Sequence, residues 1–163
     1  ALEEWEEAFE EEYQPMRDRL EHSNVGCDNF SARYVLLHTL SHLLIRQLSL
    51  ECGYSGASIK ERIYSTYPES DVKMAGILLY TSSSESFEMI FRNMLQEASW
   101  CSSDPICIES HAQGYDSLNY AACHACALLP ETSCEMRNCL LDRAAIVGTI
   151  KDRERGFFGA LLE

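Results

Sequence analysis

The strongest pattern in the chain is a dense run of apolar residues over positions 32–50. Ser31 precedes the run as a suitable helix N-cap, and Gly53 follows it as a helix terminator. The few polar side chains within the run are spaced four residues apart and therefore share one helical face. They are His38, His42 and Arg46. The pattern predicts a buried central helix that ends near Gly53.

Residues 1–21 combine a single apolar stripe with a strongly acidic remainder. The apolar residues recur at steps of three or four, as on one face of a helix: Leu2, Trp5, Phe9, Tyr13, Met16 and Leu20. The same segment holds nine acidic residues and two arginines. We expect an amphipathic helix that packs on the domain and is kinked or split at Pro15. A linker or a docking helix for a partner is the alternative.

Shorter patterns organise the rest of the chain. The capping-box sequence at Ser58 to Glu61 predicts a short helix to about Tyr64, and the apolar run 75–80 predicts a buried strand. Residues 81–86 are a polar loop. A helical face follows at Phe87, Ile90, Phe91, Met94, Leu95 and Ala98. Residues 138–150 predict a closing helix with four apolar side chains inside: Leu141, Ala145, Ile146 and Ile150. Together these elements predict an α+β, mostly α fold with one or two short strands.

Length and charge narrow the classes of protein. The chain has 163 residues and a formal net charge of −13, so it is the size of one domain and repels DNA and acidic membranes. No apolar run reaches the roughly 18–20 residues of a membrane span, so we expect no membrane partner. We expect residues 1–30 to form the acidic helix and a loop, and residues 31–163 to form the main domain. Because the chain begins at Ala1, we also expect processing or a longer parent protein.

Eight cysteines are the unusual feature of the composition, and six lie between positions 101 and 139. A core of this size does not need disulfides, so the clustering favours a metal site in a reducing compartment, the cytoplasm. Cys123-His-Ala-Cys126 is a knuckle that can present two thiolates to one Zn²⁺ ion. The preferred quartet adds Cys107 and Cys134, and all-thiolate coordination makes the site structural. Buried free cysteines or a redox-active Cys-x-x-Cys pair are the alternatives.

His38 and His42 lie one helical turn apart, a spacing that also suits a metal. A zinc protease needs Glu directly after the first histidine, whereas this chain has Thr39. We therefore expect neutral, buried histidines that hydrogen-bond to backbone carbonyls or to a carboxylate from the cysteine region, such as Asp104. A second metal site or an acid–base pair, and hence a metalloenzyme, is the alternative.

At this point the chain resembles the MrfA-type zinc-binding (MZB) domain, over roughly residues 33–148. This domain is found at the C-terminus of DrmB, a component of the DISARM antiphage system, and of some superfamily-2 helicases, and the DrmB-like form is the more similar. The resemblance is carried, in chain order, by Tyr34-Val-Leu-Leu-His-Thr-Leu-Ser-His42, Glu51-Cys-Gly-Tyr54, Glu61-Arg-Ile-Tyr64, Gly76-Ile-Leu-Leu-Tyr80, Cys101-Ser-Ser-Asp-Pro-Ile-Cys107, Ala122-Cys-His-Ala-Cys126, Glu131-Thr-Ser-Cys134 and Leu141-Asp-Arg143.

The resemblance implies one structural zinc ion held by four cysteines, which carry over to Cys107, Cys123, Cys126 and Cys134, with Cys101 in reserve. It also implies work beside a helicase partner, with DNA engaged through the complex. DrmB-like members usually carry a glycine-rich stretch where this chain has residues 81–86.

We therefore expect a noncatalytic accessory domain of a helicase-containing DNA-processing or antiphage complex. One rival is a zinc module that binds single-stranded nucleic acid directly. It would use a basic patch of Arg33, Arg137, Arg143, Lys151, Arg153 and Arg155. The other rival is the metalloenzyme built on His38 and His42.

Overall fold

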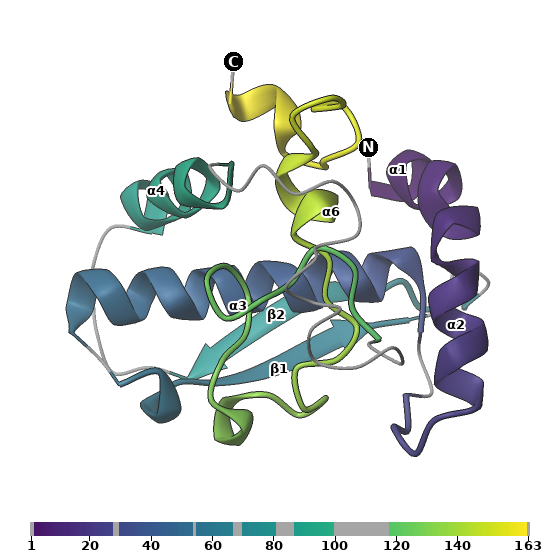
Figure 1. The fold of residues 1–163 in the computed structure, drawn as a ribbon, viewed down its shortest axis with the longest axis horizontal. Coiled ribbons are helices and arrows are strands. Elements are labelled where there is room, and N and C mark those ends of the chain that lie inside the picture. The colour runs from purple at the N-terminus through teal and green to yellow at the C-terminus, as the bar shows by residue number, and fades with distance from the viewer. Residues whose placement is uncertain are drawn as a thin grey trace.

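The fold is α+β and mostly helical, as predicted. The computed structural model describes residues 2–27, 30–53, 55–66, 70–80, 87–99 and 118–162. Its α-helices and strands are, in order, α1 (Leu2–Phe9), α2 (Gln14–Glu21), α3 (Ala32–Cys52), β1 (Lys60–Ser65), β2 (Ala75–Tyr80), α4 (Phe87–Ser99) and α6 (Arg143–Val147) (Figure 1). Short 3₁₀ turns lie between them. Among the described helices, none is both long enough and apolar enough to cross a membrane.

Helix α3 is the centre of the molecule, and its predicted limits are confirmed. The Ser31 hydroxyl accepts a hydrogen bond from the Tyr34 backbone N–H at 3.1 Å and caps the first turn. Gly53 ends the helix in the left-handed conformation, at φ 69°, which glycine adopts without steric cost. Most residues between these ends are buried, so α3 is covered on every side.

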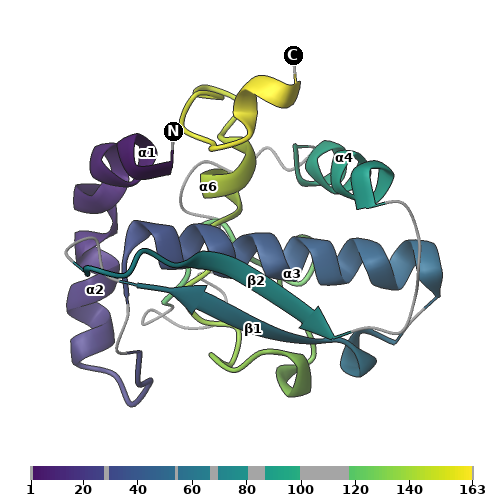
Figure 2. The ribbon, with the colours of Figure 1, turned by 180° about the vertical axis from the view of Figure 1, so that it is seen from behind.

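The other elements cover α3 from different directions. The antiparallel hairpin β1–β2 lies on one side, paired in register from Lys60 opposite Tyr80 to Ser65 opposite Ala75. Helices α1, α4 and α6 lie along another side (Figures 1 and 2). The segment from residue 118 to 142 passes in front of α3 in the view of Figure 1, and its 3₁₀ turn, Glu131–Ser133, contacts β1. The main hydrophobic core joins residues from α1, α2, α3, α4, α6 and this segment.

The short helix predicted from residue 58 to Tyr64 is wrong, because these residues form strand β1. Only a 3₁₀ turn, Gly56–Ser58, is helical. The burial alternates along the strand: Glu61 and Ser65 face α3 and are buried, whereas Lys60, Arg62 and Tyr64 are exposed. This period of two, together with pairing to β2, overrides the local capping-box signal.

The strand at residues 75–80 is confirmed as β2, but it is not buried. Leu78 and Tyr80 are 42% and 52% exposed. The register places these side chains on the same face as Tyr64, directed away from α3. We call this set the outer hairpin face. No described element covers it, as the view from behind shows (Figure 2).

The acidic N-terminal segment packs on the core as predicted. It runs as α1, a 3₁₀ turn (Glu10–Tyr13) and α2, with Pro15 at the start of α2, so the predicted interruption is confirmed. Trp5, Tyr13 and Met16 are buried in the main core. One of the acids is buried as well: Glu6 accepts a 2.5 Å charge-assisted hydrogen bond from Arg33 of α3.

The predicted closing helix over residues 138–150 is too long. Helix α6 has five residues, because Asp142 caps its start and Gly148, at φ 70°, follows its end. Residues 137, 138 and 140 before the cap have positive φ values and cannot belong to an α-helix. The apolar positions of α6 are buried as predicted, but Ile150 lies beyond the helix and is 61% exposed.

The fully buried carboxylate of Asp142 joins four parts of the chain. It accepts hydrogen bonds from the Tyr13 hydroxyl at 2.7 Å, from the Arg155 guanidinium at 2.8 Å and from the Ala144 backbone N–H at 3.0 Å. The Asp142 backbone N–H donates to Thr39 Oγ1 of α3 at 2.9 Å. Arg155 supplies the compensating charge that a buried carboxylate requires.

Replacing Asp142 should therefore destabilise the whole domain. We expect Asp142→Ala to lower the free energy of unfolding by about 3–5 kcal/mol, since Arg155 and Tyr13 lose a buried partner. Asp71→Ala is the control, because Asp71 is exposed. Equilibrium denaturant unfolding measures both variants, and equal midpoints for the two would contradict this role.

Candidate metal centre

His38 and His42 of α3 lie side by side in the interior. Both side chains are fully buried, and the two rings meet edge to face with centroids 4.6 Å apart. Nδ1 of His42 is 2.8 Å from the carbonyl oxygen of Ala127, in the segment after the knuckle. The predicted buried, hydrogen-bonded histidines are thus confirmed, including a backbone carbonyl as a partner.

The carboxylate partner of the two histidines is Glu61 of β1. Its Oε1 atom lies 3.0 Å from His38 Nε2 and 3.3 Å from His42 Nε2. Its Oε2 atom accepts a hydrogen bond from the Ser41 hydroxyl, one residue before His42. The hairpin therefore provides the carboxylate that we expected from the cysteine region. Asp104, which we named as a candidate, lies outside the described residues.

Cys134 is the fourth member of the cluster. It follows a 3₁₀ turn, Glu131–Ser133, and its Sγ atom lies 3.3 Å from His38 Nε2. The Asn138 backbone N–H donates to the same sulfur at 3.3 Å. The Asn138 side chain also binds both the N–H and the carbonyl oxygen of Leu129, at 2.9 and 2.8 Å. Asn138 thereby closes the loop that presents Cys134.

Burial and charge shift the pKa values of His38, Glu61 and Cys134. Burial, together with the neighbouring His42, lowers the pKa of His38. Burial alone would raise the pKa of Glu61, but hydrogen bonds from the two histidines hold it well below its ordinary value. Burial, with the nearby Glu61 carboxylate, raises the pKa of Cys134 to about 12. In the absence of a cation the thiol is therefore protonated, and a bound metal ion would reverse this preference.

The predicted knuckle forms a compact turn at Cys123 and Cys126. The two sulfur atoms lie 3.9 Å apart. Backbone N–H groups of Cys126, Ala127 and Leu128 all donate to the carbonyl oxygen of Cys123, which fixes the turn. Burial raises the pKa of Cys126 to about 12. This geometry allows both sulfur atoms to coordinate one metal ion.

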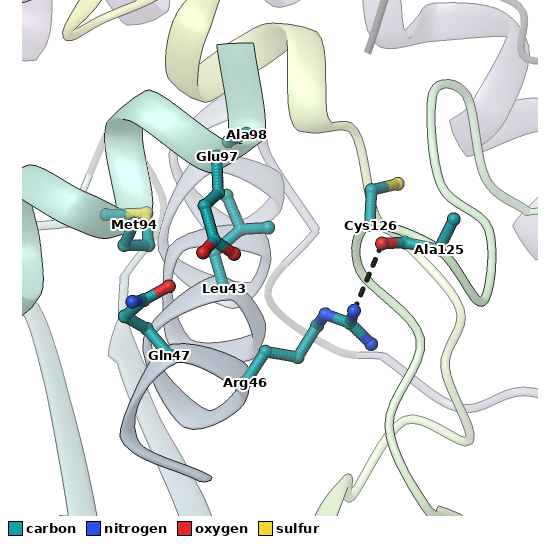
Figure 3. A pocket seen from close by; sticks show the side chains of 8 residues that line it. All are labelled: Leu43, Arg46, Gln47, Met94, Glu97, Ala98, Ala125 and Cys126. Atoms are coloured by element: carbon teal, nitrogen blue, oxygen red, sulfur yellow. Dashed lines mark hydrogen bonds between the residues drawn. The ribbon is translucent and has the colours of Figure 1, made fainter. Parts of the chain in front are cut away.

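Arg46, the third polar residue on the predicted face of α3, holds this knuckle in place. Its guanidinium donates to the carbonyl oxygens of His124 at 3.1 Å and Ala125 at 3.0 Å. Figure 3 shows Arg46 reaching from α3 toward Ala125, beside a pocket of about 530 Å³ between α3, α4 and the knuckle. Leu43, Gln47, Met94, Glu97, Ala98 and Cys126 complete the lining. Each polar residue of the α3 line thus contacts the cysteine-rich region.

Three members of the predicted cysteine quartet lie within the described residues. The structure brings Cys123 and Cys126 together, and it places Cys134 with the histidines. Cys107 and the reserve ligand Cys101 lie outside the described residues, so the quartet stays a prediction. Cys139, which we expected not to be a ligand, is partly buried, and its sulfur lies 3.8 Å from the carbonyl oxygen of Arg137.

The chemistry of the described residues fits zinc. Within the described part of the chain, one group brings at least three metal-ligating side chains together, and its four donor atoms lie within 4.8 Å of one another. It consists of His38, His42, Glu61 and Cys134. Imidazole nitrogen, carboxylate oxygen and thiolate sulfur are the three donor types that zinc takes in proteins.

Sequence reasoning missed Glu61 because it treated this residue as the end of a capping box. The alternation of Ile59, Glu61 and Ile63 with charged neighbours was the available signal of a strand, and it would have directed Glu61 inward. Asn138 and Ser41 carried no comparable signal, because their roles depend on which loops meet in three dimensions.

The fold and site define a small helical domain whose central helix and cysteine-rich segment are joined by metal-ligating side chains. Residues 40–127 match the family described as the MrfA Zn-binding domain, MZB, and this match covers more than half of the chain. The chain belongs to the MZB family of zinc-binding domains, and zinc is its cofactor.

The chain is also similar to a longer bacterial protein, the DISARM protein DrmB of Bacillus paralicheniformis. The two are 44% identical over 144 residues, which cover 79% of this chain and 25% of that protein. The chain thus spans about a quarter of the length of this relative.

Substitutions of single cysteines test the knuckle as a zinc ligand. We expect Cys126→Ser to lower the zinc content measured by elemental analysis, because a hydroxyl is a much poorer zinc ligand than a thiolate. Cys139→Ser and Cys27→Ser are matched controls and should keep the full zinc content. If Cys139→Ser released as much zinc as Cys126→Ser, the choice of ligands would be wrong.

Proposed function

We propose that this chain is a noncatalytic, zinc-stapled accessory domain of a helicase-containing complex that processes DNA in antiphage defence. The observation that carries the proposal is the joint match to the MZB family and to a DISARM protein. Because the chain spans only a quarter of that relative, the activity and partners of the whole protein belong to this proposal. We also propose that this protein is located in the cytoplasm.

The burial of the candidate ligands supports a structural role. His38 and His42 are fully buried, and Glu61 and Cys134 are 4% and 6% exposed. A catalytic zinc site keeps one position open for water or substrate. The four donor atoms lie within 4.8 Å of one another in the interior, shielded from solvent. This arrangement weighs against a metalloenzyme that uses His38 and His42.

The distribution of basic side chains weighs against direct binding of single-stranded nucleic acid. The six residues expected to form one basic patch do not do so, because three of them are buried: Arg33, Arg143 and Arg155. Arg33 pairs with Glu6, and Arg155 pairs with Glu12 and Asp142. The chain therefore keeps a strongly negative surface, which repels phosphates.

The outer hairpin face is the best place in the described structure for a protein partner. Tyr64, Leu78 and Tyr80 are exposed there, and Lys60 and Arg62 lie opposite Tyr80 and Leu78. Exposed apolar patches with a polar rim are typical of protein interaction sites, and tyrosine is enriched in them. We place the helicase partner on this face.

The double variant Leu78→Asp with Tyr80→Asp tests this surface. We expect it to weaken binding to the helicase subunit of the same system by at least about tenfold, because two charges would be buried in the interface. Leu50→Asp is the control, since Leu50 is an exposed leucine at the end of α3. Isothermal calorimetry measures binding, and thermal melting verifies that both variants are folded. Equal affinities for the two variants would place the partner elsewhere.

Salt dependence separates the accessory role from direct nucleic-acid binding. We expect no binding of this chain alone to a single-stranded oligonucleotide at low ionic strength, because the surface charge is negative. Fluorescence anisotropy of a labelled oligonucleotide provides the measurement. Tight binding that falls steeply between 50 and 200 mM salt, the behaviour of a phosphate-neutralising surface, would favour the nucleic-acid module instead.

A further inference from the structure

We propose that strand β2 pairs with β2 of a second copy of this chain, so that two hairpins join into one continuous antiparallel sheet. The contact uses the free edge of β2, which is the side of the strand away from β1. This edge is distinct from the outer hairpin face, which stays exposed in the pair. The proposal does not depend on the metal centre or on the helicase partner.

Strand β2 has the composition of a central strand but not the surroundings of one. Its six residues, Ala75–Tyr80, include no charged side chain and no proline, and a short uninterrupted apolar run of this kind is typical of a buried strand. Yet none of the six residues is buried. Even Ile77 and Leu79, which the register directs toward α3, are only half-buried. The strand therefore lacks a neighbour on one side.

The two edges of the hairpin differ in how they are protected. Strand β1 carries charged residues from Lys60 to Arg62, and its edge is contacted by the 3₁₀ turn Glu131–Ser133. Arg62 also forms a 2.7 Å ion pair with Glu135. Charges, prolines, bulges and covering loops are the devices that block unwanted strand pairing. Within the described part of the chain, β2 pairs with β1 alone, without a bulge, and carries none of these devices.

The sequence of β2 favours a second copy of itself as the added strand. Two identical antiparallel strands related by a two-fold axis must meet at a residue, because opposite side chains share one face of the sheet. With the axis at Leu78, that residue faces Leu78 of the second copy. Ile77 then faces Leu79 of the second copy, and Tyr80 faces Gly76. Both faces pair apolar with apolar groups, and no charge is buried.

Gly76 provides the space that this register needs. A Cβ atom at Gly76 would have Cβ of Tyr64, 4.0 Å away, as its nearest neighbour, so the outer face above the glycine is open. The Tyr80 ring of the second copy covers this space beside Tyr64. An aromatic side chain placed across from a glycine is a recognised way of stabilising a sheet. This fit selects Leu78, rather than Ile77, as the residue on the axis.

The placement of charge is compatible with self-association. Two chains of net charge −13 repel each other unless their acidic segments lie far apart. The acidic helices α1 and α2 lie beside the end of the hairpin where β2 begins (Figure 2), and Lys73 lies 3.9 Å from Glu3 there. A two-fold axis at Leu78 therefore places the two acidic segments at opposite ends of the shared sheet.

Exchange of charge at Leu78 tests the pair. We expect sedimentation equilibrium in about 0.15 M salt, where charges are screened beyond about 8 Å, to show that the unaltered chain dimerises. Leu78→Lys and Leu78→Glu each place like charges face to face and should raise the dissociation constant at least about tenfold. An equimolar mixture of the two variants should restore the dimer, because opposite charges then meet. Leu50→Lys and Leu50→Glu, at another exposed leucine, are the matched controls and should dimerise normally.

Hydrogen exchange of the unaltered chain provides a test that needs no variant. The backbone amides of β2 should become more protected as the protein concentration rises, because the added strand supplies their hydrogen-bond partners. A chain that stays monomeric up to millimolar concentration, or a dimer that the mixture of Leu78 variants does not restore, would overturn the proposal. Protection of β2 by the helicase subunit alone would place a strand of that partner on the edge instead. The accessory role would survive each of these results, because it does not require self-association.

Discussion

The structure depends on one constraint, the need to satisfy the polar groups of a helix that is buried on every side. Helix α3 carries arginine, threonine, serine and histidine side chains among its apolar residues, and several covering elements supply their partners. Arg33 pairs with Glu6 of α1, and the Thr39 hydroxyl accepts a hydrogen bond from the Asp142 backbone N–H. Both histidines and the Ser41 hydroxyl contact the carboxylate of Glu61 from the hairpin. Because unsatisfied buried groups are costly, these contacts select how each covering element docks.

Local signals were sufficient wherever a segment determines its own structure. The limits of α3 follow from Ser31 and Gly53, and the helical face of α4 follows from the spacing of its apolar residues. Local signals failed where a partner distant in the sequence decides the structure of the segment. Strand β1 carries a helix-capping sequence but pairs with β2, and α6 begins only at Arg143 because Asp142, which binds Tyr13 and Arg155, caps its start. Neither partner could be identified from the neighbouring sequence.

The candidate site shows the same division. The spacing of His38 and His42 identified two residues that share a face, and the Cys-x-x-Cys spacing identified the knuckle. What spacing could not provide is which cysteine meets which group. Cys134 follows the knuckle by eight positions, yet the loop closed by Asn138 presents it to the histidines. Glu61 could not be identified as a possible metal ligand while residues 58–64 were predicted to be helical, because only strand β1 directs its side chain inward.

The two ends of the chain are fastened to each other. The Trp5 indole N–H donates to the carbonyl oxygen of Arg155, 150 residues away, and the Arg155 side chain binds Glu12. Trp5 and Glu12 are therefore synthesised well before Arg155, their partner later in the chain. Contacts of such long sequence separation slow folding. The apolar stripe of the N-terminal segment therefore lacks part of its cover until the residues around Arg155 have been made, and during this interval the nascent chain is open to aggregation or to chaperone capture.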